Sequence, residues 1–274
     1  MLNKTVRGLH TYSALRTLAL LVVAVSAVIA MPAHAFSALV SPPRVELKVK
    51  PGQTVREVIE INHTARTPGK YRLYTADWKF APDYSVLFDD KLADNSCRPW
   101  VALERRELTL PAQGKARYRF EVTVPADATE RECTFGLMVE GEEQRVASSG
   151  MSFPVSGRIG VIIYVQVGNV QPQLVITPAA SAVVDGQRVP MVSVRNTGTA
   201  HGRLAGFVSG TDAAGQKIEF TPSSLPILPG ETRLLSLQAA LPGGAPVTIK
   251  YPVSVTGTLE WGNSKTPFSH QYAQ

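Results

Sequence analysis

The sequence predicts an all-β protein with two β-sandwich domains in tandem. Short strand-like runs recur along the chain, turn signals such as Pro51-Gly52, Asp185-Gly186 and Pro229-Gly230 separate them, and no amphipathic helix of useful length occurs. After an N-terminal export signal about 240 residues remain, enough for two ordinary domains. We expect the first domain to cover residues 36–167 and the second to cover residues 168–274.

Residues 1–35 are predicted to be a cleavable signal peptide. Three basic residues precede an apolar run from Leu18 to Ala30, and Ala33-His34-Ala35 provides small residues for cleavage. The run is shorter than the about 20 apolar residues that cross a bilayer, and no second run follows. We expect an exported chain that begins near Phe36 and has no membrane span, with an uncleaved anchor as the alternative.

The charge pattern argues against nucleic acid as a partner. The whole chain carries a net charge of +6, but the signal holds three of its 28 basic residues and none of its 22 acidic ones. The mature chain therefore has 25 basic and 22 acidic residues, a net charge of +3. Its charges alternate in sign along strands, as in Arg117-Tyr118-Arg119-Phe120-Glu121, and no basic block with interleaved aromatic residues occurs.

Alternation of apolar and polar residues identifies individual strands, each with one buried and one solvated face. Antiparallel strands of this kind at short spacing are typical of a sandwich or barrel. The clearest apolar sets are Val45, Leu47 and Val49; Tyr118, Phe120, Val122 and Val124; and Val253, Val255, Leu259 and Trp261.

The two halves of the chain also share a repeated sequence pattern. The stretch Leu108–Gly114 precedes the alternating strand Ala116–Val124, and Leu225–Glu231 precedes Arg233–Ala239 in the same way. Self-similarity of this kind is typical of a duplicated module, so one fold used twice is expected.

The two cysteines, Cys97 and Cys133, are expected to form a structural disulfide. An exported chain reaches an oxidising compartment, where paired cysteines close loops. A redox-active pair is the alternative, but it would prefer a Cys-x-x-Cys spacing, which is absent.

Signatures of catalysis are missing from the sequence. None of the five histidines lies in a metal-ligand pattern, and nucleophile elbows, phosphate-binding loops and dinucleotide fingerprints are absent. The adjacent carboxylates Asp89-Asp90 and Glu142-Glu143 are expected to be solvated. We therefore expect no enzyme activity, catalytic residue, cofactor or metal.

Several segments together carry a resemblance to one family. In order they are Pro43-Arg44-Val45-Glu46-Leu47, Arg98-Pro99-Trp100-Val101 with Leu108-Thr109-Leu110-Pro111, Pro125-Ala126-Asp127, and the strand from Arg158 to Val165. Over most of the mature chain the sequence resembles PapD-like periplasmic chaperones of the chaperone–usher type. The resemblance implies two immunoglobulin-like domains, a periplasmic location and pilus or fimbrial subunits as partners. It leaves open whether an outer-membrane usher is a further partner.

In that family an arginine and a lysine in the cleft between the domains hold the subunit's C-terminal carboxylate. Arg44 matches the arginine, and its guanidinium can hold a carboxylate through two hydrogen bonds. An ordinary solvated arginine is the alternative. Gly160 falls at the lysine position, and a slip of two residues brings Arg158 there on the same face. The resemblance thus implies Arg44, with Arg158 as a weaker second candidate, as the carboxylate site.

The resemblance also implies a donor strand, whose alternate side chains complete a subunit that lacks its last strand. The candidate residues are Ile159, Val161, Ile163 and Val165. A central strand covered on both faces is the alternative. The preceding segment, Glu140–Gly157, is expected to be a polar loop.

These observations favour a non-enzymatic periplasmic chaperone that acts on pilus or fimbrial subunits by strand donation and carboxylate anchoring, without nucleotide. The alternative is a structural or adhesive tandem immunoglobulin-like envelope protein that donates no strand.

Overall fold

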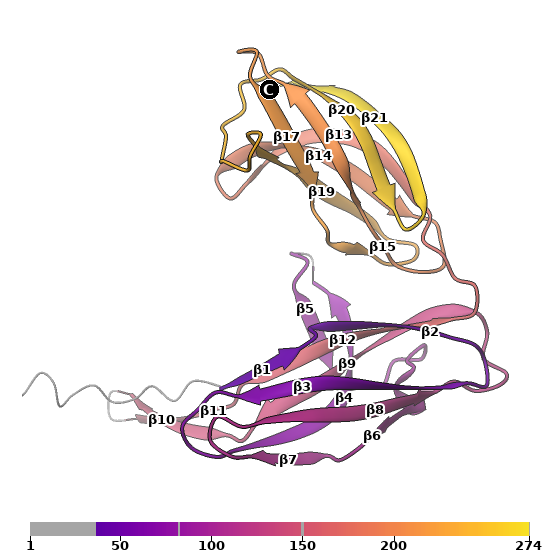
Figure 1. Cartoon of the computed structure of the whole chain (residues 1–274), viewed down its shortest axis with the longest axis vertical. Helices are drawn as coiled ribbons and strands as arrows, with labels where there is room; N and C mark the ends of the chain where they lie inside the picture. The colour runs from indigo at the N-terminus through magenta and orange to yellow at the C-terminus, as the bar shows by residue number, and fades with distance from the viewer. Residues whose placement is uncertain (1–36, 82, 149–150, 274) are drawn as a thin grey trace, which may run out of the picture.

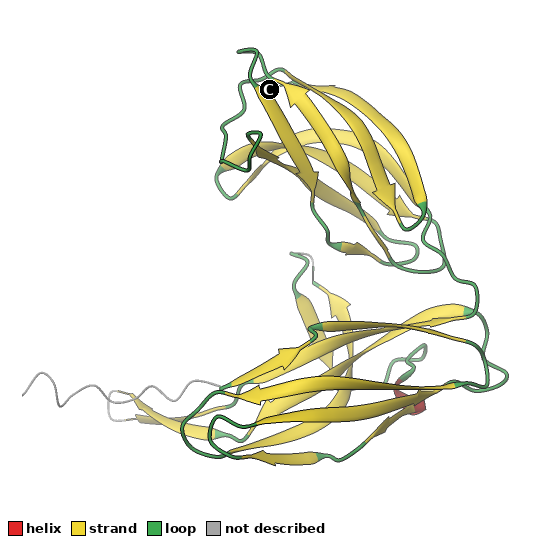
Figure 2. Cartoon of the chain, viewed as in Figure 1, coloured by secondary structure: helices red, strands yellow, loops and turns green. Residues whose placement is uncertain are grey.

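The computed structural model describes residues 37–81, 83–148 and 151–273, which are almost entirely β-strand (Figures 1 and 2). In this part of the chain the only helix is a short 3₁₀ turn, η1 (Arg98–Trp100), and no helix is long and apolar enough to cross a membrane. The expected signal peptide, residues 1–35, lies outside the described residues. Two separate hydrophobic cores confirm two β-sandwiches, and the chain passes from the first to the second between Val167 and Leu174.

The first sandwich packs two sheets face to face, with side chains from both inner faces forming its core. One sheet has the order β1 (Ala38–Ser41), β3 (Thr54–His63), β8 (Lys115–Thr123) and β6 (Val101–Leu103). The other has the order β2 (Arg44–Val49), β12 (Arg158–Val167), β9 (Arg131–Gly141), β4 (Gly69–Phe80) and β5 (Val86–Asp89), with β7 (Glu107–Leu110) also paired to β4.

The alternation seen in the sequence decides which side chains enter this core. Tyr118, Phe120 and Val122 of β8 are all buried and face the opposite sheet, where the ring of Phe120 meets that of Phe135 edge to face at 6.3 Å. Leu47 of β2 is buried in the same core. The predicted apolar faces of these strands are therefore confirmed.

The second sandwich is formed by one long sheet that folds over its own core. Its strands follow the order β13 (Leu174–Val184), β14 (Gln187–Asn196), β19 (Thr232–Ala240), β17 (Lys217–Pro222), β16 (Ala205–Thr211), β20 (Val253–Trp261) and β21 (Ser264–Tyr272), with the small pair β15 (Gly202–Arg203) and β18 (Pro226–Ile227) beside it. The predicted face of β20 is confirmed, because Val253, Val255, Leu259 and Trp261 are buried.

Strand β12 is central over one part of its length and open over the other. From Ile162 to Val167 it pairs with β2 in parallel and with β9 in antiparallel. From Arg158 to Val161 it pairs with β9 alone, and no described strand lies along its other edge. Strand β12 is therefore a central strand from Ile162 to Val167, and its edge is open from Arg158 to Val161.

The segment before β12 is a hairpin and not the loop expected for Glu140–Gly157. Strand β9 runs on to Gly141, and β10 (Gln144–Ser148) then pairs with β11 (Met151–Val155) in antiparallel. In Figure 1 this hairpin extends from the end of the first domain that lies away from the second domain. The serine and glycine residues of this segment favoured a loop over the short apolar alternation of Met151, Phe153 and Val155.

Strands β4 and β5 form a second hairpin, which rises from the first domain toward the second (Figure 1). Phe88 of β5 lies against two glycines of the sheet below, Gly136 in β9 and Gly160 in β12. A Cβ atom at Gly160 would lie 2.2 Å from Cζ of Phe88, and one at Gly136 would lie 2.7 Å from its Cε1. Because glycine has no side chain, the ring of Phe88 fits over Gly136 and Gly160, and this contact holds β5 in place.

Candidate functional site

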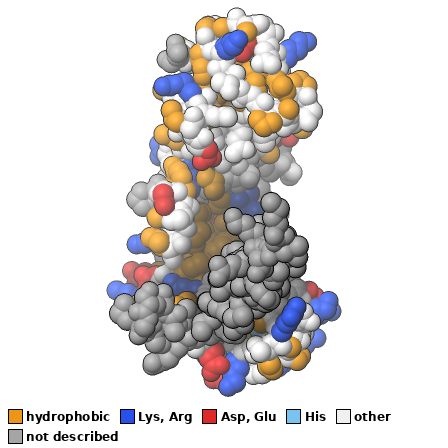
Figure 3. Space-filling view, turned by 90° about the vertical axis from the view of Figure 1, so that its left-hand side faces the viewer, with side chains coloured by type: hydrophobic (Ala, Val, Ile, Leu, Met, Phe, Trp, Pro, Cys, Tyr) orange, Lys and Arg blue, Asp and Glu red, His pale blue; other side chains and the backbone are white. Residues whose placement is uncertain are grey.

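A cavity of about 640 Å³ lies between the two domains. The space-filling view shows hydrophobic side chains gathered in the hollow between the domains (Figure 3). Three parts of the chain form its walls: the adjacent strands β2 and β12, the β4–β5 hairpin, and the β15–β18 region of the second domain. The lining residues are Pro42, Pro43, Arg44, Trp78, Phe80, Tyr84, Val86, Ile162, Tyr164, Arg203, Leu225 and Pro226.

Arg44 lies in this cavity, as expected, at the first position of β2. The chain leaves β1 and reaches β2 through Pro42 and Pro43, and Arg44 then takes its place beside Ile162 of β12. Because Leu47 and Val49 point into the core, Arg44 points the other way. Its side chain is 52% exposed, and its Nε lies 3.5 Å from Oε1 of Glu46, so its donors remain accessible to a ligand.

Arg158 does not join Arg44. It lies four residues before Ile162 on β12, a separation of about 13 Å along a strand. Its side chain is hydrogen-bonded to Tyr74 of β4, which raises the pKa of Arg158. Arg158 therefore does not supply a second positive charge to the cavity.

Gly160 cannot be replaced by a lysine within the present packing, because the ring of Phe88 fills the space that its side chain would need. The family pattern of an arginine with a lysine on the same sheet is thus physically blocked in this chain.

The second cation in the cavity is Arg203 of β15, from the other domain. Its Nη1 donates to the carbonyl of Ser224 at 2.8 Å, but its Nε is buried without a hydrogen-bond partner. Burial lowers the pKa of Arg203, and the positive charge of Arg44 acts in the same direction. In the described part of the chain no carboxylate forms an ion pair with Arg203. Two guanidinium groups therefore face one cavity from opposite domains.

Tyr164 forms the floor between these cations. Its ring is 2% exposed and stacks on the imidazole of His201 with centroids 3.8 Å apart. Burial is the main cause that raises the pKa of Tyr164 to about 12; the carboxylates of Glu132 and Glu46 also raise it, whereas Arg203 and Arg44 lower it. The phenol therefore stays neutral at physiological pH and adds no negative charge beside the two arginines.

The donor role expected for Ile159, Val161, Ile163 and Val165 stays a prediction, but in the chain without a client these side chains belong to the first core. Val161, Ile163 and Val165 are fully buried in the core of the first domain, and Ile159 packs against the same core. The exposed apolar side chains of this segment come earlier, on β11: Phe153 is 47% exposed and Val155 is 51% exposed. Phe153 and Val155 precede the odd-numbered apolar residues of β12 in the same alternation, but they lie beyond the part that the opposite sheet of the sandwich covers.

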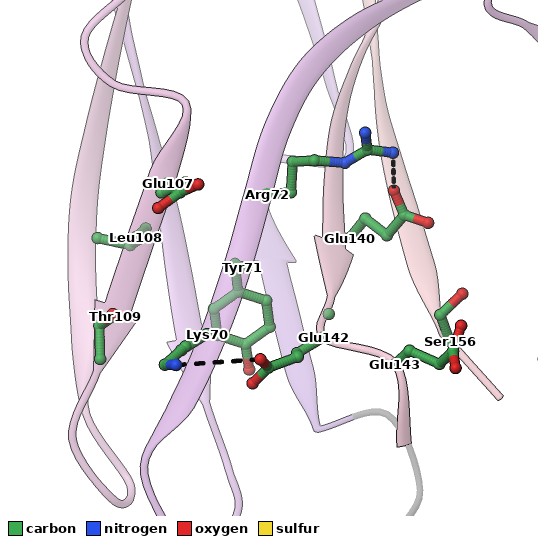
Figure 4. A pocket seen from close by; sticks show the side chains of 11 residues that line it. Lys70, Tyr71, Arg72, Glu107, Leu108, Thr109, Glu140, Glu142, Glu143 and Ser156 are labelled. Carbon is green, nitrogen blue, oxygen red and sulfur yellow. Dashed lines mark hydrogen bonds and ion pairs between the residues drawn. The ribbon is translucent and has the colours of Figure 1, made fainter. Parts of the chain in front are cut away.

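A second cavity, of about 470 Å³, lies at the other edge of the first domain (Figure 4). Both of its cations already pair with carboxylates: Nη2 of Arg72 lies 2.7 Å from Oε2 of Glu140, and Nζ of Lys70 lies 3.9 Å from Oε1 of Glu142. Paired and exposed charges of this kind have little left to offer a ligand. The interdomain cavity is therefore the better candidate site.

Cys97 and Cys133 lie side by side and buried, as free thiols. The contact with Cys133 and the burial of both groups raise the pKa of the Cys97 thiol. Their proximity is compatible with the expected disulfide, which stays a prediction.

Sequence reasoning missed Arg203 and the aromatic residues of the β4–β5 hairpin. Trp78 and Phe80 end an alternating strand and look like ordinary core residues, while Arg203 belongs to a two-residue strand with no pattern. No signal in the sequence links these segments to Arg44. Among the described residues no group of histidine, cysteine, aspartate or glutamate side chains is arranged to hold a metal ion.

No protein-family model and no curated protein sequence matches this chain. Among solved structures it is similar to the YadV chaperone, with 9% identity over 87% of this chain and 100% of that chain and a TM-score of 0.47. It is also similar to the class 5 fimbriae chaperone CfaA, with 11% identity, 86% and 99% coverage and a TM-score of 0.46. A third is a chain of the CsuC–CsuE chaperone–tip adhesion subunit pre-assembly complex of Acinetobacter baumannii, with 11% identity over 85% of this chain and 98% of that chain and a TM-score of 0.44.

Proposed function

We propose that this protein is a non-enzymatic periplasmic chaperone for pilus or fimbrial subunits. It binds a subunit strand along the open edge of β11 and β12 and holds the subunit's C-terminal carboxylate between Arg44 and Arg203. The observation that carries the proposal is the position of Arg44 at the point where β2 begins, since this is where the open edge of β12 ends.

The direction of the bound strand follows from this arrangement. Beyond Ile162 the edge of β12 is occupied by β2, which runs parallel to it. A client strand on the free edge lies in line with β2, and its last residue meets Arg44 only if it too runs parallel to β12. From Val155 to Val161 the free edge is about 20 Å long at roughly 3.3 Å per residue, enough to pair with an extended segment of the client.

Phe153 and Val155 supply the apolar contacts of the client strand. These two large apolar side chains are about half exposed on a narrow hairpin, so part of their apolar surface is free to contact a client. Burial of the remaining exposed half in a client that lacks a strand of its own would contribute about 1 kcal/mol for each side chain, roughly half the value for complete burial. Folding and binding of the client supply this free energy, so no nucleotide is needed.

Arg44 and Arg203 fix the end of the client strand. A guanidinium holds a carboxylate with two charge-assisted hydrogen bonds, and the buried Nε of Arg203 lacks an acceptor. Two arginines from different domains can clasp one carboxylate only while the domains keep their relative orientation. Pilus subunits as the client and the periplasm as the location rest on the resemblance of the sequence.

The test is capture of pilus subunits by the mature protein, expressed with them in a bacterial periplasm. We expect a subunit to co-elute with the wild type, and the double variant Phe153→Ser/Val155→Ser to lose it. The matched control is Phe207→Ser, which removes an 88% exposed phenylalanine from β16 of the second domain. Equal loss with the control, or no loss with the double variant, contradicts the proposed strand.

The alternative is a structural or adhesive envelope protein that donates no strand. It predicts that no subunit co-elutes and that amide hydrogen exchange along residues 151–161 is the same with and without subunits. The chaperone proposal predicts protection of these amides when a subunit is present.

A further inference from the structure

The β4–β5 hairpin makes the interdomain cavity a walled pocket. Phe80 and Tyr84 of this hairpin lie on the guanidinium of Arg233 in the second domain, at 4.0 and 4.5 Å from their ring centroids. Arg233 is only 3% exposed, and its Nε is held by Oε2 of Glu231 at 3.0 Å. Contacts between a buried cation and two aromatic rings of another domain hold the hairpin against that domain.

The hairpin is fixed at its other end as well. Phe88 occupies the space over Gly136 and Gly160, so β5 cannot slide on the sheet. Trp78 packs edge to face against Phe80 at 5.1 Å and against Tyr164 at 5.9 Å. The wall between Arg44 and the second domain is therefore preformed and aromatic.

Buried donors without acceptors surround this pocket. They are Nε of Arg203, Nε1 of Trp78 and, behind the hairpin rings, Nη1 of Arg233. Buried polar groups in native proteins nearly always have a hydrogen-bond partner. We therefore interpret these unpaired donors as groups that a bound ligand can supply with acceptors. Two of the three belong to side chains that line the cavity.

The volume and chemistry of the pocket define its ligand. A cavity of about 640 Å³ is much larger than a carboxylate needs, and it falls in the range of sites that hold small organic molecules. Its wall consists largely of aromatic and aliphatic groups, whereas Arg44 and Arg203 supply positive charge at one place. The complementary group carries an anionic carboxylate beside a large apolar side chain.

We propose that the pocket selects the terminal residue of the bound chain, accepting an aromatic side chain against Trp78, Val86 and Leu225 while Arg44 and Arg203 hold the carboxylate of the same residue. This selectivity rests on the function proposed above. The interdomain pocket would then recognise the client's last residue, while β11 and β12 contact the strand that precedes it.

The experiment titrates small probes into the mature wild-type protein and follows the indole N–H signals of its three tryptophans by NMR. The probes are N-acetylphenylalanine, N-acetylglycine and N-acetylphenylalanine amide. We expect the first to shift the Trp78 signal and leave those of Trp100 and Trp261 unchanged, and the other two to bind at least about tenfold more weakly, one lacking the ring and the other the charge. Arg203→Ala should remove the preference for acid over amide, whereas Arg158→Ala should retain it.

Equal binding of N-acetylphenylalanine and N-acetylglycine, or no shift of Trp78 by any probe, overturns the selectivity. A second arm compares a captured subunit that ends in phenylalanine with the same subunit ending in glycine. If the two are captured equally well, the pocket does not read the client's last residue, but the chaperone function stands. If N-acetylphenylalanine binds and no subunit is captured, the pocket is a site for free aromatic carboxylates and the chaperone function fails.

Discussion

His201 of the second domain donates two hydrogen bonds to the carboxylate of Glu132 in the first: Nδ1–H donates to Oε2 at 2.7 Å, and the backbone N–H donates to Oε1 at 2.9 Å. Both side chains are almost fully buried, at 4% and 2% exposure. Gln166 also donates to Oε2 at 3.0 Å. One carboxylate thus ties the second domain to β9 and β12 beside the linker.

Replacing Glu132 with alanine should loosen the two domains from one another. The change leaves the backbone N–H of His201 buried without a partner, which costs about 1–3 kcal/mol. We expect the radius of gyration from X-ray scattering to increase and the thermal unfolding midpoint to fall. The control is Glu121→Ala, which removes a carboxylate of β8 that is 40% exposed and pairs with Arg56 of the adjacent strand β3. No difference between the two variants would show that this contact does not orient the domains.

Replacing Arg44 or Arg203 with alanine should weaken subunit capture more than replacing Arg158. Loss of a charge-assisted hydrogen-bonded pair costs about 1.5–3 kcal/mol, roughly a 10- to 150-fold increase in Kd. Because Arg44 is half exposed, its removal should change the free energy of unfolding by less than about 0.5 kcal/mol. Arg44→Lys should recover only part of the affinity, since it keeps the charge and loses the second hydrogen bond.

The measurement is Kd for a purified subunit, with a melting curve for each variant. Arg158→Ala is the matched control, because it removes a guanidinium from β12, the strand that pairs with β2, at a position outside the cavity. Unchanged affinity in Arg44→Ala would contradict the carboxylate site. Unfolding of that variant would instead make Arg44 a structural residue.

Gly160→Ala should destabilise the first domain through Phe88. The added Cβ would overlap Cζ of Phe88, and overpacking of this kind typically costs about 1–3 kcal/mol. If the clash is the cause, Gly160→Ala should cost much less in a Phe88→Ala background, and urea unfolding of the two single variants and the double variant measures this coupling. Additive effects would rule out the contact as the cause.

Cys97 and Cys133 should be joined in protein taken from the periplasm. Closing a loop of this length stabilises a fold by roughly 4 kcal/mol in the chain-entropy model. We expect peptide mapping without reductant to recover the two cysteines in one linked fragment, and the Cys97→Ser/Cys133→Ser variant to melt at a lower temperature. Recovery of both thiols in the free form would show that the pair is an ordinary part of the buried core.

Asp212 should make the second domain sensitive to acid. Its carboxylate accepts hydrogen bonds from the backbone N–H groups of Ala214, Gln216 and Lys250, and these, led by Gln216, lower the pKa of Asp212. A carboxyl group whose pKa is lower in the folded state stabilises that state above its unfolded pKa of about 3.9, and this stabilisation is lost as the pH falls through the folded pKa.

Asp212→Asn should therefore melt at a lower temperature than the wild type at neutral pH, since the amide cannot accept all three hydrogen bonds. The difference should stay constant down to about pH 4 and shrink below it. Melting curves of both proteins between pH 7 and pH 2 measure this. A difference that does not shrink in acid would show that the charge of Asp212 is not what stabilises the turn.

The local pattern of the sequence was enough to predict many of the strands, whereas Arg44 became a candidate through the resemblance, and the pattern added only the direction of its side chain. Alternation with a period of two decides which face of a strand is buried, so Leu47 and Val49 already direct Arg44 away from the core, whatever the rest of the chain does. The tandem sandwiches follow in the same way from many short alternating strands separated by turns.

Only the tertiary structure decided which residues meet Arg44 and which apolar residues stay exposed. Arg203 reaches the cavity because the second domain folds back over the first, and no local pattern encodes a contact between segments so far apart in sequence. Apolar residues occupy alternate positions from Phe153 to Val165, with an interruption only at Gly157, so this pattern does not show where the covering sheet ends. That limit is set by the length of the strands packed against it, which buries Val161 and leaves Phe153 in solvent.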